Sequence, residues 1–233
     1  MMIEREFGGG MKFTLILCGV LMALGMVVFW NYRNTLWEQA DNLDRLPVMA
    51  QLDRPLEGIN HRGEEVSFQD LRGKVWVIAY ADTFSPAGSE PLIMRLKALQ
   101  DEFAGEENFH LVALSKDPDK DTPERMLQWG KARGLGEGNW WFMTGVPKKI
   151  RTYVGKYFKL YVTPRTDPHE IATYGPWETD HRLSLVDQAG AIRAQYEVLD
   201  ARVGEGHEKQ LRIDIKNLLK HGHNFGGPGR QSQ

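Results

Sequence analysis

Cysteine is almost absent from this sequence of 233 residues. The single cysteine, Cys18, lies within an apolar run near the N-terminus, so the remainder of the chain carries no thiol. An internal disulfide, a pair of redox cysteines and a thiolate metal site therefore cannot be built from this chain. Thiol–disulfide exchange and cysteine-based peroxide reduction are excluded too, because both need a thiolate as the attacking group.

A strong excess of one charge is also missing. The chain has 29 Lys and Arg residues against 31 Asp and Glu residues, which gives a formal net charge of -2. Proteins that bind nucleic acids concentrate Lys and Arg on one face to meet the phosphates. The balanced charge therefore predicts no nucleic-acid partner.

The N-terminal region does contain a long apolar run. Residues 13–30, FTLILCGVLMALGMVVFW, carry no charge, and about eighteen apolar residues are near the lower limit for crossing a hydrocarbon layer of roughly 30 Å. Basic residues precede the run, and Trp30, Tyr32 and Trp37 lie where interfacial aromatic residues are found. We therefore predict a transmembrane anchor over residues 12–32, with the rest of the chain on the extracytoplasmic side.

A cleaved signal peptide is the alternative interpretation of the same run. No small-residue cleavage site follows it, and the bulky residues Phe29, Trp30 and Tyr32 stand there instead. The sequence thus favours an anchor that is retained in the mature protein.

The chain beyond the predicted anchor divides into three parts. Residues 33–48 are polar with aromatic and Leu interruptions, and they predict a short helical stalk. Residues 49–220 have the alternating patterns of one folded domain. Residues 221–233, HGHNFGGPGRQSQ, are rich in glycine and predict a flexible tail.

Within the domain, apolar strands alternate with helical patterns. KVWVIAY (74–80) and FHLVALS (109–115) are continuous apolar runs, typical of strands buried on both faces of a central sheet. Between them, apolar residues at spacings of three and four predict a helix. A further helix is predicted to begin with Thr122 as its cap and Pro123 in its first turn, and residues 182–198 predict a hairpin. This order predicts an α/β domain with a mixed sheet and flanking helices, as in a thioredoxin-like fold.

The turn between the first of these strands and its helix, TFSPAGSEP (83–91), is rich in hydroxyl groups. Thioredoxin-like proteins keep their reactive cysteines at this junction, whereas this chain has Ser85 and Ser89 there. Without further information, the simplest interpretation is that both serines start the helix, with hydroxyls that cap its free N–H groups.

Four segments resemble the Sco/SenC family, whose members are membrane-anchored thioredoxin-fold factors associated with copper delivery to cytochrome c oxidase. The segments are FQDLRGKVWVIAY, LVALSKDPDKDTPERMLQW, NWWFMTG and DHRLSLVDQAG, and they follow one another in the family's order. The resemblance, which runs from about Leu52 to Val198, implies a single-pass protein of the inner (cytoplasmic) membrane with a periplasmic domain. It also implies cytochrome oxidase subunits, or a cysteine-bearing Sco-like protein, as partners.

The family's copper site has two cysteines spaced CxxxC after the first core strand and one distant histidine. Carried over residue by residue, these positions fall on Ser85, Ser89 and His181, and the proline that usually follows the second cysteine is displaced to Pro91. Cu(I) is a soft ion that thiolate, thioether and imidazole groups hold, and hydroxyl groups do not replace them. We therefore expect thiol-dependent Cu(I) binding to be lost and no cofactor to be bound.

Two alternatives retain chemistry at this junction. Asp82, Glu90 and His181 form a candidate site of hard ligands for a divalent metal ion, although both carboxylates also suit a solvated helix start. A hydrolase would combine one of the serines with His181 and either Asp82 or Asp180, but the chain has no nucleophile elbow of the G-x-S-x-G type. The leading hypothesis is a non-catalytic docking or assembly factor for cytochrome oxidase, with a metal carrier or sensor as the alternative.

Overall fold

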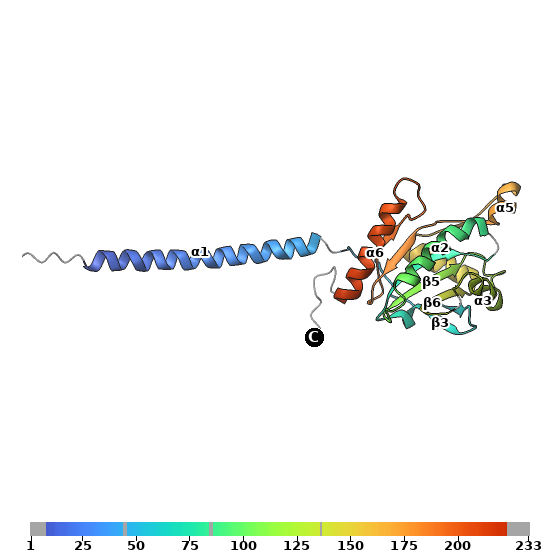
Figure 1. Ribbon diagram of the computed structural model, residues 1–233, viewed down its shortest axis with the longest axis horizontal. Helices are drawn as coiled ribbons and strands as arrows, with labels where there is room; N and C mark the ends of the chain where they lie inside the picture. Colours follow the sequence, from blue (N-terminus) through green and yellow to red (C-terminus); the bar gives the residue numbers. More distant parts are fainter. Residues whose placement is uncertain (1–7, 44–45, 84–85, 136, 223–233) are drawn as a thin grey trace, which may run out of the picture. The chain divides into compact units, whose positions relative to one another are not determined.

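The computed structural model describes residues 8–43, 46–83, 86–135 and 137–222 (Figure 1). The chain divides into two compact units, Met1–Arg45 and Leu46–Gln233. The predicted flexible tail beyond residue 222 lies outside the described residues.

The first unit consists of one continuous helix, α1 (Gly8–Leu43). Its segment Ile16–Arg33 is long and apolar enough to cross a membrane, by length and composition, and its side chains are exposed. Because a signal sequence near an N-terminus meets the same criterion, α1 is a candidate membrane span. The helix has no break between the predicted anchor and the first part of the predicted stalk.

The second unit is built on a mixed eight-stranded sheet with the strand order β1-β10-β9-β4-β5-β6-β2-β3. Strands β4, β5 and β6 are parallel, and the other pairs are antiparallel. A separate two-stranded ribbon joins β7 to β8. The ten strands are β1 (Ala50–Gln51), β2 (Glu57–Asn60), β3 (Glu65–Ser67), β4 (Val75–Ala81), β5 (Phe109–Ser115), β6 (Trp140–Thr144), β7 (Val162–Pro164), β8 (Trp177–Thr179), β9 (Leu183–Val186) and β10 (Ala191–Tyr196).

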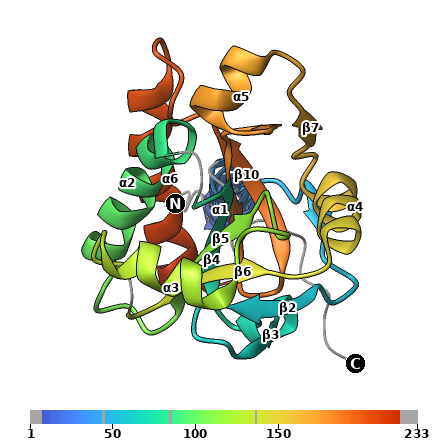
Figure 2. The ribbon, with the colours of Figure 1, turned by 90° about the vertical axis from the view of Figure 1, so that its right-hand side faces the viewer.

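Helices cover both faces of this sheet (Figure 2). Helices α2, α3 and α6 lie on one side of the central strands and α4 lies on the other, as the two hydrophobic clusters of the core confirm. A short α5 stands in the chain between β7 and β8. The helices are the 3-10 turn η1 (Phe68–Leu71), α2 (Pro86–Glu102), α3 (Pro123–Lys131), α4 (Pro147–Tyr157), α5 (Pro168–Tyr174) and α6 (Gly204–His221).

Strand β4 shows why the sequence folds into these layers. All seven of its residues are buried, as predicted for a central strand. Alternate side chains of a strand point to opposite faces. Val77 and Ala79 accordingly join the cluster under α2, α3 and α6, whereas Trp76, Ile78 and Tyr80 join the cluster under α4.

The predicted start of α3 is also confirmed. Thr122 is the N-cap residue and Pro123 stands in the first turn, while the Thr122 side chain accepts a hydrogen bond from the backbone N–H of Arg125. The predicted α/β class, the mixed sheet and the C-terminal hairpin of β9 and β10 are all present. This arrangement brings the carboxyl ends of β4 and β5 together at one edge of the domain.

Candidate functional site at the carboxyl ends of two parallel strands

The sequence-predicted site lies where β4 and β5 end. The last residues of the two strands, Ala81 and Ser115, are partners in the parallel ladder. The N–H of Lys116 donates to the carbonyl of Ala81 at 2.9 Å, so the chains stay paired one residue further. Helix α2 begins at Pro86 and α3 at Pro123. Ligands of open α/β sheets bind at the carboxyl ends of the strands, and this junction is therefore the candidate site.

The two serines of the junction differ in what the structure says of them. Ser85 lies outside the described residues. Ser89 is buried in the first turns of α2, and its hydroxyl accepts a hydrogen bond from the backbone N–H of Asp82 at 3.1 Å. The prediction that Ser89 caps the helix is therefore wrong, because its hydroxyl satisfies an N–H at the end of β4 and not one in the helix.

Asp82 forms a buried ion pair with Lys116, which is not among the site residues predicted from the sequence. The Oδ2 atom of Asp82 lies 2.5 Å from Nζ of Lys116, and the two side chains are 2% and 3% exposed. Burial, followed by the positive charge of Arg165, lowers the pKa of Lys116 to about 8, against the opposing effect of Asp121 and Asp117. The junction therefore contains a fixed ammonium group that is largely protonated at neutral pH.

Asp121 links the ends of the two strands from the loop before α3. Its Oδ1 atom accepts hydrogen bonds from the N–H and the hydroxyl of Thr83, at 3.1 and 2.6 Å. Its Oδ2 atom accepts one from the hydroxyl of Ser115 at 2.5 Å. Burial raises the pKa of Asp121, although these hydrogen bonds lower it. Asp121 thus links the end of β5 to the segment that follows β4.

His181 lies at the same end of the sheet. It precedes β9 by two residues, and β9 is antiparallel to β4, so the residues before β9 lie beside the carboxyl end of β4. Desolvation lowers the pKa of His181, and the positive charge of Lys116 lowers it further. The histidine of the predicted copper set is therefore close enough to the buried ammonium group to sense its charge.

Glu90, the third predicted hard ligand, has a different partner. Its Oε2 atom lies 2.8 Å from Nε of Arg133, and the Arg133 guanidinium lies over the ring of Trp129 at 4.1 Å. Within the described ranges of the chain, no three His, Cys, Asp or Glu side chains form a group that could hold a metal ion. The structure thus brings Asp82 and His181 to the junction, while Glu90 interacts with the end of α3.

The contacts of the acidic residues also bear on the hydrolase alternative. Asp180 forms an ion pair with Arg182, in which Nη2 lies 2.5 Å from Oδ2. Asp82 is paired with Lys116, and Ser89 accepts its hydrogen bond from a backbone N–H. A catalytic triad needs a serine that donates to a histidine and an acid that orients that histidine. The contacts described above for Ser89 and the two acids are made with other groups, and not with a triad partner.

Fold and junction together define an α/β protein of thioredoxin-like architecture whose strand-to-helix junction has hydroxyl groups and a buried ion pair. A model of the SCO1/SenC family matches residues 46–205. The chain belongs to this family, and the matched residues include every described strand.

This chain is similar to several proteins of known sequence or structure. The SCO1 protein homolog of Bacillus subtilis is 28% identical over 105 residues, which are 44% of this chain and 54% of that protein, so the match spans about half of the relative's length. BsSco, described as a member of the Sco family of cytochrome c oxidase assembly proteins, has a TM-score of 0.57 and 21% identity, over 76% of this chain and 98% of that chain. Bradyrhizobium japonicum ScoI with copper bound has a TM-score of 0.54 and 18% identity, over 69% and 97% of the two chains.

Proposed function

We propose that this protein is a non-catalytic docking or assembly factor for cytochrome c oxidase, tethered to the membrane, in which thiol-dependent Cu(I) binding is lost. The observation that carries the proposal is the donor set at the junction. The family position at residue 89 has a hydroxyl group, and the neighbouring Asp82 carboxylate is the ion-pair partner of Lys116. The oxidase link comes from the family and from BsSco, a member of the Sco family of cytochrome c oxidase assembly proteins.

The residues at the junction do not fit Cu(I). Soft Cu(I) selects thiolate and thioether sulfur, with imidazole as a further ligand, and of these the junction offers the imidazole of His181 alone among its described side chains. The Asp82 carboxylate at the junction neutralises the charge of Lys116, and a carboxylate is a hard ligand that Cu(I) does not prefer. We therefore assign the junction a structural role.

A metal carrier with hard ligands is the competing function, and it requires the imidazole of His181 as a ligand. In cells that lack the native copy, we expect the His181→Ala variant to restore cytochrome oxidase assembly as well as the unaltered protein does. A docking factor does not need the imidazole, whereas a carrier loses a ligand. Oxidase activity and subunit content of the membranes measure the outcome.

Metal content provides the control for this complementation experiment. The purified protein is dialysed against Zn(II), Mn(II) and Cu(II) in turn and then analysed for bound metal. Stoichiometric metal in the unaltered protein that is lost in His181→Ala, together with failed complementation, would contradict the docking function and support the carrier.

The proposed location is the inner membrane, with residues from about 33 onward on the periplasmic side. The apolar segment of α1 and the basic residues before it support this orientation. We expect the protein to stay in the membrane fraction after alkaline extraction and to be degraded by protease added to spheroplasts. Mature protein that begins near Asn34 and is found free of the membrane would show that the segment is a cleaved signal.

A further inference from the structure

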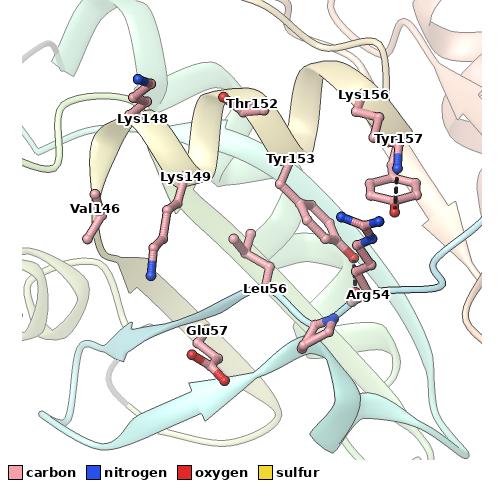
Figure 3. Close-up of a pocket in the computed structure, with 11 residues that line it drawn as sticks. Arg54, Leu56, Glu57, Val146, Lys148, Lys149, Thr152, Tyr153, Lys156 and Tyr157 are labelled. Atoms are coloured by element: carbon pink, nitrogen blue, oxygen red, sulfur yellow. Dashed lines mark hydrogen bonds between the residues drawn. The ribbon is translucent and has the colours of Figure 1, made fainter.

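A concave site lies away from the junction, between α4 and the chain segment that leads into β2 (Figure 3). Its volume is about 670 Å³. We call it the basic groove and define it by the six residues Arg54, Lys148, Lys149, Tyr153, Lys156 and Tyr157. It shares no residue with the junction described above.

The groove is strongly positive although the whole chain is nearly neutral. Arg54, Lys148, Lys149 and Lys156 line it, and all four residues are exposed. Glu57 is the one acidic residue among its lining side chains. A concave surface with charges of one sign concentrates its field and attracts ligands of opposite charge.

The position of two of these lysines opposes the local stability of the helix. Lys148 and Lys149 stand in the first turn of α4, which has no acidic residue there and whose N-cap residue, Val146, makes no side-chain capping bond. The N-terminus of a helix carries partial positive charge, so cations are unfavourable at this end and anions are favourable. An anionic ligand in the groove would relieve this repulsion.

The floor of the groove is apolar and held in place. Tyr153 and Tyr157 are each 8% exposed, and the centroids of their rings lie 4.6 Å apart. The hydroxyl of Tyr153 donates to the carbonyl of Arg54 at 2.7 Å, and that of Tyr157 donates to the carboxylate of Asp53. Figure 3 shows Tyr153 projecting from α4 toward Arg54. Binding therefore needs little rearrangement of the floor, which reduces its entropic penalty.

A cationic rim around a buried aromatic floor suits a ligand that is both anionic and partly apolar. We propose that the basic groove binds an acidic segment of a partner protein, one that also carries an apolar or aromatic side chain. The cations would pair with its carboxylates, and its apolar side chain would lie on the tyrosines and Leu56. This inference rests on the proposed docking function, to which it adds the surface and the chemistry of the partner.

The depth of the apolar groups favours a protein segment over a membrane surface. Interfacial helices insert protruding apolar side chains into the headgroup region. Here Leu56 is 4% exposed and both tyrosines are 8% exposed, while the lysines and Val146, which is 55% exposed, stand at the rim. A planar bilayer would meet the lysines but not the floor, whereas a polypeptide segment can enter the groove.

The test uses the full chain in nanodiscs of zwitterionic phospholipid and a phage-displayed library of random peptides. Peptides selected on the unaltered protein should combine Asp or Glu with an apolar or aromatic residue. A synthetic copy should bind the Lys149→Glu, Lys156→Glu double variant roughly tenfold more weakly or worse, and added salt should weaken it further. The matched control is Lys131→Glu with Lys220→Glu, which makes the same charge change at exposed residues of α3 and α6 and should change the affinity little.

Three results with peptides would overturn the inference. The selection yields no enriched peptide, or the enriched peptides lack acidic residues, or both double variants weaken binding equally. A short-chain anionic phospholipid that alone binds the groove, and loses binding in Lys149→Glu with Lys156→Glu, would identify a lipid site instead. None of these results depends on the junction, so the copper measurements and the His181→Ala complementation test the proposed function separately.

Discussion

Changing Ser85 and Ser89 together to cysteine should create a site that retains about one Cu(I) per protein against an excess of chelator. By resemblance to the family, the two positions correspond to its CxxxC cysteines, and His181 lies at the same end of the sheet. Two thiolates and an imidazole would then form the soft ligand set that the natural sequence lacks. The measurement is a titration of the Cu(I)-loaded protein with a chromogenic chelator, on residues 46–233, which contain both core clusters and no native cysteine.

Two variants control this experiment. Replacing the same two serines with alanine should leave the protein unable to retain Cu(I), because no sulfur is added. His181→Ala in the double-cysteine background should weaken retention, since one ligand is lost. A double-cysteine protein that is folded and reduced but fails to retain Cu(I) would show that the site has diverged beyond its two sulfurs. The displaced Pro91 and the Lys116 charge would then be the features to examine.

The Lys116→Met substitution should lower the free energy of unfolding by about 3–5 kcal/mol, because it removes the cation that balances the charge of the buried Asp82 carboxylate. Methionine fills a similar volume, so the effect reports charge more than packing. Urea unfolding of residues 46–233 followed by circular dichroism measures the change. No other single substitution discussed above is expected to destabilise the domain as much.

Replacing both residues of the ion pair distinguishes the loss of the pair from the cost of leaving one buried charge behind. The Lys116→Met, Asp82→Leu double variant should regain most of the lost stability, because a buried ion pair exchanged for apolar groups is often neutral. Lys209→Met, which removes a pair with Glu205 on the solvent face of α6, should leave the stability almost unchanged. If Lys116→Met is no more destabilising than Lys209→Met, the ion pair is not a buried structural element.

The sequence predicted the central strands well because their signal is local. KVWVIAY and FHLVALS are unbroken apolar runs, and they form β4 and β5 to within one residue. The segment between Val162 and Thr179 left no such signal. Its two strands have three residues each, and α5 has no buried residue, so neither apolar periodicity nor length marked them.

The buried ion pair was missed for a different reason. Asp82 and Lys116 are distant in sequence, and each one alone looks like a polar residue at the end of an apolar run. The parallel pairing of Ala81 with Ser115 makes them neighbours. Both residues follow strands that the sequence predicts to be central, but the sequence does not predict that these strands pair in parallel, and that pairing brings the two residues together.

The role of Ser89 shows the limit of local reasoning at the same junction. A serine beside Glu90 near a helix start is typical of a capping residue. Its actual partner, the backbone N–H of Asp82, depends on how α2 packs against the end of β4. Tertiary packing decides such a contact, and one sequence does not reveal it.

The most direct test of the central claim is a Cu(I) competition on the unmodified domain. Residues 46–233, reduced and loaded with Cu(I), are titrated with a chromogenic chelator from stoichiometric concentration upward. We expect the chelator to take all of the copper at the first addition, because the junction offers hydroxyl, imidazole and ammonium groups in place of thiolates. Retention of one Cu(I) per protein against excess chelator, lost in His181→Ala, would contradict the claim that this protein no longer binds Cu(I).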